Sequence, residues 1–364
     1  MANEKQTEKN EALTVVVGLS GGVDSSVAAF LLKQKGFKVV GLHMKNADDA
    51  AETEDEQSIK DLCEKLDIKY HVVNYSNEMQ LVKDYFENEY RAGRTPNPCV
   101  VCNREVKFKP FIDFANKIGA DYFATGHYAN IDHNNGRHQL LRAADESKDQ
   151  TYFLNQLSQA QLEKAIFPLG NLTKQEARDI AEKNGFVSAH KKDSFDVCFI
   201  GSEKFKTYME KNYPSKEGKI VDIKTNKVVG SHKGLTGYTI GQRKGLGIGG
   251  GKGATGDCWF VVEKDAKTNT LLVAQGNDDV LYSDALESNM FNWISEKPQG
   301  SFECTAKFRY RQIDQPVVVS VKENGSVLVE FKQKQRAITL GQYVVLYNGE
   351  KCVGGGTIDK IIKN

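Results

Sequence analysis

The sequence predicts an α/β protein in which a doubly wound parallel sheet is followed by a small mixed central domain and a C-terminal β-barrel. Three observations support this prediction. Strand and helix patterns alternate through the first 200 residues, glycine becomes dense after about residue 205, and short strand-like runs occupy the rest of the 364-residue chain. We place the domains at residues 1–205, 206–275 and 276–364.

In the first region, apolar and β-branched runs alternate with segments whose apolar residues recur at helical spacing. We expect strands at residues 14–17, 39–43, 70–74 and 122–125, and helices at residues 23–35, 57–66, 78–90 and 108–118. Strands separated by helices of ordinary length imply a parallel sheet that is covered by helices on both faces.

The second half of the chain is predicted to be mostly β-structure. We expect strands at residues 259–262, 270–273, 304–310, 317–321, 327–331 and 343–347. The dipeptides Asn324-Gly325 and Asn348-Gly349 separate some of these runs and are typical of hairpin turns.

Composition favours a cytoplasmic protein. No apolar run has the length of a membrane span. An odd number of cysteines, spread thinly along a chain without a secretory signal, is typical of reduced thiols in a cytoplasm. They are Cys63, Cys99, Cys102, Cys198, Cys258, Cys304 and Cys352.

Charge is unevenly distributed although the net charge of the chain is only +1. Residues 41–90 carry 13 acidic and 5 basic side chains, whereas residues 201–252 carry 11 basic and 4 acidic ones. The basic segment could face a polyanion, or it could be an ordinary solvated surface.

The segment Gly18-Leu-Ser-Gly-Gly-Val-Asp-Ser-Ser26 runs from the first expected strand into a helix. Glycines let the backbone approach a ligand, and the N–H groups of a helix start attract an anion. Ser20, Ser25 and Ser26 add hydroxyl donors, while Asp24 would repel phosphate unless Mg²⁺ lay between them. Neither the Walker nor the dinucleotide motif is present. The segment resembles the pyrophosphate-binding loop of the ATP pyrophosphatases (the PP-loop), which implies ATP as a substrate.

The pair Cys99 and Cys102 has Cys-x-x-Cys spacing. Such a pair can be half of a zinc site, a redox dithiol, part of an iron–sulfur site, or two ordinary thiols. The spacing by itself leaves these alternatives open.

Motifs along nearly the whole chain resemble those of the bacterial tRNA-specific 2-thiouridylases, the MnmA/TrmU family. Besides the glycine loop, they are Gly93-Arg-Thr-Pro-Asn-Pro98, Cys102-Asn-Arg-Glu-Val-Lys-Phe-Lys109, Ala124-Thr-Gly-His-Tyr128, Lys148-Asp-Gln-Thr-Tyr-Phe-Leu154, Ser194-Phe-Asp-Val-Cys-Phe-Ile200, Gly237-Tyr-Thr-Ile-Gly-Gln-Arg-Lys-Gly-Leu-Gly-Ile248 and Lys307-Phe-Arg-Tyr310. The resemblance implies a PP-loop ATP-binding catalytic domain at 1–205, a central tRNA-binding domain at 206–275, and a sulfurtransferase that replaces O2 of the wobble uridine by sulfur.

The resemblance also implies residue roles. The expected ATP contacts are Gly18, Leu19, Ser20, Gly21, Gly22, Val23, Asp24, Ser25, Met44 and Gly126. The target base is expected at Asn97, Pro98 and Cys99, and tRNA at His127, Lys148, Asp149, Gln150, Arg309, Tyr310 and Gln342. Cys198 would carry a persulfide, and Cys102 would release its outer sulfur and close a disulfide. The sulfur would come from a donor protein, such as a cysteine desulfurase or a relay protein, or from free sulfide.

Cys99 departs from the family pattern, because better-known members carry aspartate there. Cys99, Cys102 and Cys198 could therefore meet at one site. Two mechanisms stay open: a Cys198 persulfide resolved by Cys102, or a [4Fe–4S] cluster held by the three thiolates. By analogy with related tRNA thiolases, the open iron of such a cluster could deliver sulfide.

Two other functions are compatible with parts of the sequence. An ATP pyrophosphatase acting on another RNA base or a small molecule would keep the glycine loop, but a small substrate needs neither the basic segment nor the β-rich tail. An RNA-binding protein with a degenerate loop would not need Ser20, Asp24 and Ser25, which are all present.

Overall fold

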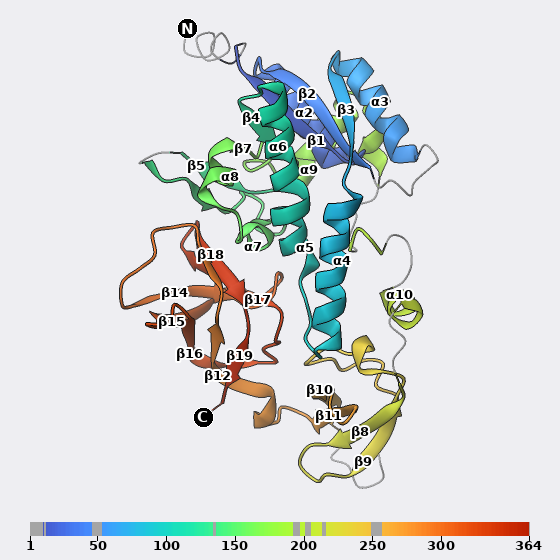
Figure 1. Cartoon of the computed structure of the whole chain (residues 1–364), viewed down its shortest axis with the longest axis vertical. Coiled ribbons are helices and arrows are strands. Elements are labelled where there is room, and N and C mark those ends of the chain that lie inside the picture. The colour runs from blue at the N-terminus through green and yellow to red at the C-terminus, as the bar shows by residue number, and fades with distance from the viewer. Residues whose placement is uncertain are drawn as a thin grey trace.

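The computed structural model of the chain describes residues 10, 12–45, 53–133, 136–191, 197–200, 205–212, 216–248 and 257–363. Figure 1 shows a parallel-sheet region at the top, with the barrel sheet and a smaller central sheet below it. Helix α4 (Ser76–Arg91) runs from the first region towards the central sheet (Figure 1). Residues 194–196 of one family motif, and residues 201–204, 213–215 and 249–252 of the basic segment, lie outside the described residues.

A five-stranded parallel sheet forms the first region, in the strand order β3-β2-β1-β4-β7. Its strands are β1 (Thr14–Leu19), β2 (Lys38–Lys45), β3 (Lys69–Asn74), β4 (Tyr122–Ala124) and β7 (Ala165–Ile166). The helices of this region include α2 (Val23–Gln34), α3 (Glu54–Leu66), α4, α6 (Lys109–Ile118), α8 (Gln159–Lys164) and α9 (Lys174–Lys183). The doubly wound fold is confirmed, as are the four strands and four helices expected in its first part. The short strand β7 was not predicted.

The strand order reverses between β1 and β4. Strands β2 and β3 extend the sheet on one side of β1, whereas β4 and β7 extend it on the other. In open α/β sheets, ligands bind at the carboxyl ends of the strands beside such a reversal. The glycine loop follows β1 and residues 125–127 follow β4, so the topology brings both to one edge of the sheet.

Helical structure begins at Pro98, ten residues before the position that the sequence predicted. Helix α5 (Pro98–Val101), π-helix η1 (Cys102–Phe108) and α6 follow one another without a break. Pro98 lies in the first turn of α5, where its ring preorganises the backbone and its missing N–H is not needed. A π-helix is rare and often marks a functional site, and this one begins at Cys102.

The central region is built on a four-stranded sheet in the order β10-β11-β8-β9. Its strands are β8 (Gly218–Asp222), β9 (Val228–His232), β10 (Trp259–Asp265) and β11 (Thr270–Gln275), and helix α10 (Phe205–Asn212) precedes them. Strand β11 pairs with β8 in parallel, and the other pairs are antiparallel. The sequence predicted β10 and β11 but neither β8 nor β9.

The barrel sheet has the order β19-β12-β16-β15-β14-β17-β18-β6-β5, with β13 paired to β18. Its C-terminal strands are β12 (Tyr282–Ser288), β13 (Phe291–Trp293), β14 (Ser301–Lys307), β15 (Gln315–Val321), β16 (Val327–Arg336), β17 (Tyr343–Asn348), β18 (Lys351–Thr357) and β19 (Lys360–Ile362). The expected strand at 304–310 ends at Lys307, which is a correction. The chain turns there because the side chain of Gln312 accepts the N–H of Phe308, at 2.9 Å.

Strands β5 (Asn130–Asp132) and β6 (Gln139–Leu141) come from the first region but complete the barrel sheet. Leu140 of β6 pairs with Cys352 of β18. Val16 and Phe123 of the parallel sheet share one hydrophobic core with Leu140 and with barrel residues that include Tyr347. The first region and the barrel are therefore joined by both a sheet and a core.

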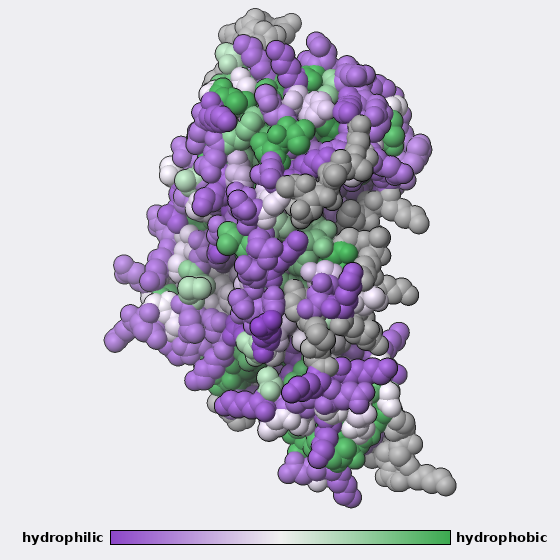
Figure 2. Space-filling view, turned by 45° about the vertical axis from the view of Figure 1, so that its right-hand side comes forward, coloured by the Kyte–Doolittle hydropathy of each residue, from purple (hydrophilic) through white to green (hydrophobic). Residues whose placement is uncertain are grey.

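Figure 2 shows a face on which hydrophilic residues prevail and hydrophobic residues form separate small patches. Among the described residues, no helix is long and apolar enough to cross a membrane.

Replacing Leu140 by alanine is predicted to lower the free energy of unfolding by about 2–5 kcal/mol, because it leaves a cavity in the shared core. Leu140 is 0% exposed. Urea denaturation followed by circular dichroism measures the change.

The matched control is Leu81→Ala on α4, where the side chain is 58% exposed and the effect should stay within about 0.5 kcal/mol. Equal effects of the two substitutions would contradict the shared core.

Candidate active site

The glycine loop forms the start of α2 and leaves its N-terminus open to an anion. Gly22 is the N-cap residue, and no side chain caps the helix there. Gly21 has φ +74°, and a Cβ at this position would lie 2.7–2.8 Å from atoms of Asp55. Ser25 stabilises the turn, because its Oγ accepts the N–H of Ser20 at 3.2 Å and donates to the carbonyl of Gly22 at 3.0 Å. This arrangement suits a phosphate group.

Gly126 packs directly against the glycine loop. A Cβ at Gly126 would lie 2.8 Å from the carbonyl carbon of Asp24 and 2.9 Å from the nitrogen of Ser25. Only glycine allows the segment after β4 to approach the loop so closely. The sequence predicted Gly126 as an adenosine contact, and the structure supplies a packing role for the same position.

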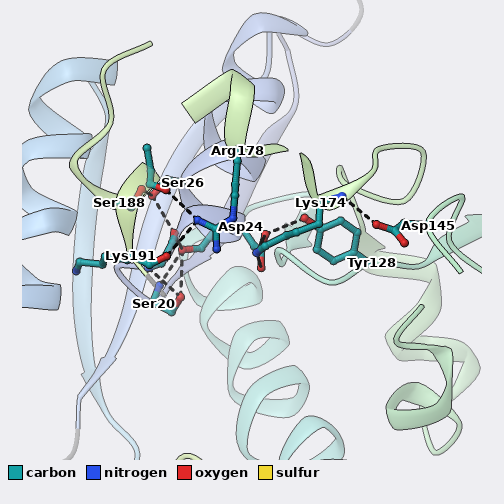
Figure 3. Close-up of polar contacts among 12 residues, drawn as sticks. Ser20, Asp24, Ser26, Tyr128, Asp145, Lys174, Arg178, Ser188 and Lys191 are labelled. Carbon is teal, nitrogen blue, oxygen red and sulfur yellow. Dashed lines mark hydrogen bonds and ion pairs between the residues drawn. The ribbon is translucent and has the colours of Figure 1, made fainter. Parts of the chain in front are cut away.

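Asp24 is neutralised within the protein by Lys174, the first residue of α9. Lys174 Nζ lies 2.7 Å from Asp24 Oδ1 and 2.8 Å from Oδ2. The Tyr128 hydroxyl donates to Asp24 Oδ1 at 2.9 Å. In Figure 3, Lys174 and Tyr128 lie on one side of Asp24. An ammonium group therefore stands where the sequence suggested that Mg²⁺ would be needed.

On the other side of the loop, Ser26 and Ser188 meet (Figure 3). The Ser188 hydroxyl donates to Ser26 Oγ at 3.0 Å. Arg178 of α9 donates to the carbonyls of Ala189 at 2.9 Å and Lys191 at 3.2 Å. Together these bonds hold the segment around residue 188 against the start of α2, so α9 supports the loop as well as supplying Lys174.

The structure brings Cys102 and Cys198 together, although 96 positions separate them in the chain. Phe199 packs edge-on against Phe86 of α4, with ring centroids 5.3 Å apart, and so anchors the segment that carries Cys198. Cys198 is exposed and Cys102 is buried, and both are free thiols. The pair thus lies at the surface of the first region, with one sulfur open to reactants.

The hydrogen bond between the two sulfurs shifts the pKa values of Cys102 and Cys198 in opposite directions. The Cys102 thiol donates to Cys198, which lowers the pKa of Cys198 to about 6, against the opposing effect of burial, and Lys107 lowers it further. The same bond and burial raise the pKa of Cys102. Cys198 is therefore a thiolate at neutral pH, and Cys102 remains a thiol.

Cys99 lies close enough to Cys198 and Lys107 to interact with both electrostatically. Surrounding protein atoms raise the pKa of Cys99, and Lys107 opposes this effect. The Cys99 side chain is nonetheless solvent-exposed. Cys99 is thus a neutral thiol at the mouth of the site and a poor substitute for an aspartate.

The thiols do not fit an iron–sulfur cluster as they stand. Within the ranges that the structure describes, no group of three or more histidine, cysteine, aspartate or glutamate side chains is placed to hold a metal ion.

The expected base pocket is made of buried residues. Asn97 and Pro98 are buried, and Cys99 follows them at the surface. The Asn97 side chain lies within hydrogen-bonding reach of the Tyr152 hydroxyl. Met44, an expected adenosine contact, lies nearby and is half-buried against the cluster that contains Cys102.

Three residues expected to contact tRNA make internal hydrogen bonds. Asp149 is buried and accepts from the Thr151 hydroxyl at 2.7 Å. Gln150 Oε1 accepts the N–H of Tyr128 at 2.9 Å. His127 Nδ1 lies 2.7 Å from the Thr125 hydroxyl, and burial, with help from Lys107, lowers the pKa of His127 well below its usual range. His127 is therefore neutral at pH 7, and these three contacts with tRNA stay predictions.

Of the other expected tRNA residues, Arg309, Tyr310 and Gln342 belong to the barrel region, and Lys148 belongs to the first region. Lys148 is half-buried. Tyr310 packs against Phe153 with the two rings tilted and their centroids 4.5 Å apart. Arg309 donates to the carbonyl of Ala337 and, at 3.5 Å, to that of Ile240, so it joins the barrel to the central region. Gln342 contacts the segment just before Asn97.

Two residues of the site were not predicted from the sequence. Lys174 follows Thr173, whose capping box with Glu176 is an ordinary helix-start signal and concealed the role of the lysine. Lys107 is the cation beside Cys99, Cys102 and Cys198, but nothing in the sequence indicated a π-helix that would bring it there.

Comparison with known proteins places relatives of this chain among tRNA-modifying enzymes. Residues 13–202 match the family model described as tRNA methyl transferase HUP domain, residues 206–275 its PRC-barrel domain, and residues 283–358 the aminomethyltransferase beta-barrel domain. The tRNA-specific 2-thiouridylase MnmA of Alkaliphilus oremlandii is 52% identical, over 96% of this chain and 98% of the relative. That of Oceanobacillus iheyensis is 53% identical, over 98% of both chains.

A solved structure of the U34-tRNA thiolase NcsA from Methanococcus maripaludis, with its [4Fe-4S] cluster, is more distant. It is 18% identical, covers 58% of this chain and 73% of that chain, and has a TM-score of 0.35. Likeness at that level does not transfer the cluster to this chain.

Alkylation of Cys198 by iodoacetamide is predicted to follow a titration with a midpoint near pH 6. The rate should rise as the thiolate forms and stay constant above that pH, whereas Cys99 should react only at higher pH. Peptide mass spectrometry after timed labelling, from about pH 5 to about pH 9, measures both rates.

In Cys102→Ala the hydrogen bond is lost, and the Cys198 midpoint should move up towards the usual thiol value of 9.0. A wild-type midpoint already at that value would show that the pair is not polarised.

Proposed function

This chain belongs to the tRNA-specific 2-thiouridylase family, and we propose that it replaces O2 of the wobble uridine by sulfur in an ATP-dependent reaction. As a member of that family it is a sulfurtransferase that acts on tRNA. The proposal concerns the position of the base, the use of ATP and the route of the sulfur.

The polarised pair of Cys102 and Cys198 is the observation that carries the proposal. A sulfur-transfer enzyme must take sulfur from a donor on one cysteine and must later release it from that cysteine. The thiolate is the nucleophile, so we expect the exposed Cys198, whose pKa the hydrogen bond from the buried Cys102 lowers, to be the residue that accepts sulfur. Cys102, held as a thiol beside it, is in place for the release.

We propose that sulfur passes from the donor to Cys198, then to the base, and that Cys102 releases it. The Cys198 thiolate attacks the outer sulfur of a persulfide on a donor protein, and the donor thiolate leaves. The Cys198 persulfide then attacks C2 of the activated uracil, and the adenylated oxygen departs as AMP. Cys102, on losing its proton, attacks the inner sulfur of Cys198. The bond between the Cys198 sulfur and the sulfur on C2 breaks, and 2-thiouridine forms. A Cys102–Cys198 disulfide remains for an external thiol to reduce.

Activation of O2 is assigned to the glycine loop. The open N-terminus of α2 and the hydroxyls of Ser20 and Ser25 would hold the phosphates of ATP. Lys174 already cancels the charge of Asp24, which would otherwise repel them. If Mg²⁺ binds with ATP, Asp24 is its candidate ligand.

Uracil C2 cannot be reached inside a stacked helix, so the base must be extruded. The expected base site, Asn97 and Pro98, directly precedes Cys99 in the chain, and Cys102 follows three residues later. Exposed basic side chains of the central region would face the phosphates of the anticodon stem-loop. Among the described residues they include Lys216, Lys219, Lys224, Lys227, Lys233, Arg243 and Lys244.

The direct test combines purified protein, ATP, a persulfide-carrying donor and an unmodified tRNA transcript. Nucleoside mass spectrometry should detect 2-thiouridine only when ATP is present. Cys198→Ser should reduce the rate by more than about 1,000-fold, because it removes the nucleophile. Cys258→Ser, a cysteine of the central region, is the matched control and should retain activity. Thiolation without ATP, or by Cys198→Ser, would refute the proposal.

Replacing Lys174 by methionine is predicted to weaken ATP binding by about tenfold, because the Asp24 carboxylate then faces the phosphates uncompensated. Isothermal titration with ATP measures the change. Lys183→Met at the exposed end of the same helix is the control and should bind ATP normally. Equal affinities of the two variants would remove Lys174 from the nucleotide site.

A further inference from the structure

All three regions of the molecule meet at residues 93–98, the segment between α4 and α5. This segment ends in Asn97 and Pro98 of the proposed base pocket, and Cys99 follows it. Thr95, Pro96, Asn97 and Pro98 are all buried. Two prolines limit the freedom of the backbone here, so a shift at Thr95 would move Asn97 as well.

The barrel holds the segment through its main chain. The Gln342 side-chain amide donates to the carbonyl of Thr95 at 2.9 Å and to that of Pro96 at 3.1 Å. The N–H of Thr95 donates to the carbonyl of Leu340 at 2.9 Å. Gly341, with φ +87°, permits this approach, since a Cβ there would lie 3.0 Å from the Thr95 carbonyl oxygen.

An ion-pair network fastens the same junction. Arg94 Nε lies 2.7 Å from Glu89 Oε2 on α4, and Arg94 Nη2 lies 2.9 Å from Asp359 Oδ1 on the barrel side. All three side chains are about one-fifth exposed, so water screens the pairs only partly. Arg94 therefore ties the end of α4 to the barrel immediately before Thr95.

Lys264 of β10 reaches the segment from the central region. Its Nζ donates to the carbonyl of Arg94 at 3.3 Å and lies 3.5 Å from the Thr95 hydroxyl. The same ammonium lies 5.5 Å from the centre of the Tyr90 ring. Burial lowers the pKa of Lys264 to about 8. A partly desolvated ammonium is costly, and these contacts offset part of that cost.

The two donors of the Gln342 amide are both used by these carbonyls, so its side chain has only the Oε1 acceptor left for another partner. Phosphate oxygens and most base edges that a glutamine would bind need a donor. The geometry thus favours a role for Gln342 inside the protein over the contact with tRNA that the sequence suggested.

We propose that Gln342 of the barrel and Lys264 of the central region are positioning residues, which set the geometry of the base pocket by holding the backbone at residues 94–96. The inference rests on the proposed function, because that function places the base at Asn97. The base pocket then reaches its working geometry only when the barrel and the central region both contact residues 93–98. The two residues act through Thr95 and Asn97 and touch neither the base nor ATP.

Loss of a positioning residue affects the step that needs the aligned base more than it affects the affinity for tRNA. Displacements near 1 Å in an active site can cost about 100-fold in rate. Gln342→Glu keeps the size of the side chain but removes both donors and places a carboxylate against two carbonyls. Lys264→Met keeps most of the aliphatic stem and removes the ammonium group.

The experiment compares each variant with a control that carries the same substitution at an exposed position of the barrel region: Gln342→Glu with Gln333→Glu, and Lys264→Met with Lys297→Met. Thiolation is measured at saturating ATP with varied tRNA, and hydrogen exchange is followed at residues 93–95. We expect kcat to fall about 10- to 100-fold in the two junction variants, while KM for tRNA stays within about threefold and exchange at residues 93–95 becomes faster. The controls should match the wild type.

Two results would overturn the inference: a rise in KM for tRNA with unchanged kcat, which indicates direct contacts with tRNA, or unchanged exchange at residues 93–95 in both variants. A wild-type protein that binds tRNA but makes no 2-thiouridine would instead contradict the proposed function. Hydrogen exchange needs no activity, so it would still decide whether Gln342 and Lys264 hold the segment.

Discussion

Reversal of the strand order between β1 and β4 is the constraint on which the rest of the site depends. It brings the glycine loop after β1 and the segment after β4 to one edge of the parallel sheet. Gly126 can then pack on the backbone of Asp24 and Ser25. Helix α9 follows β7 on the same side of the reversal, and from there Lys174 reaches Asp24. The topology of the sheet thus assembles the proposed ATP site.

Sulfur chemistry depends on a second feature, the continuous helical run from Pro98 through η1 to α6. Its start carries Cys99 and Cys102, and Lys107 lies on the same run, so one element supplies two thiols and the cation that acts on them. Cys198 joins them from a separate segment anchored by Phe199. The barrel shares a hydrophobic core with the parallel sheet. This core fixes the position of the barrel residues that contact residues 93–98.

The sequence predicted the parts of this structure that local patterns encode. Strands β1 to β4 are continuous apolar or β-branched runs, and the glycine loop is a contiguous motif, so both were identified. Strands β5 and β6 were missed because each has only three residues, and β6 joins the barrel sheet through β18, which comes from the other end of the chain. The meeting of Cys102 with Cys198 came from the family resemblance, since no spacing rule relates residues so far apart. Lys264 was missed because a lysine in a strand is normally a solvated side chain.

Whether Cys198 carries the sulfur is tested most directly by mass spectrometry of the protein during a single turnover. After exposure to a persulfide donor, the account predicts the mass of one added sulfur atom on the peptide that contains Cys198 and not on the one that contains Cys102. After tRNA and ATP are added without a reductant, it predicts loss of that sulfur to the tRNA and a disulfide between Cys102 and Cys198. Sulfur transfer to tRNA with both cysteines still free, or with the added sulfur found on Cys99 or Cys102, would contradict the account.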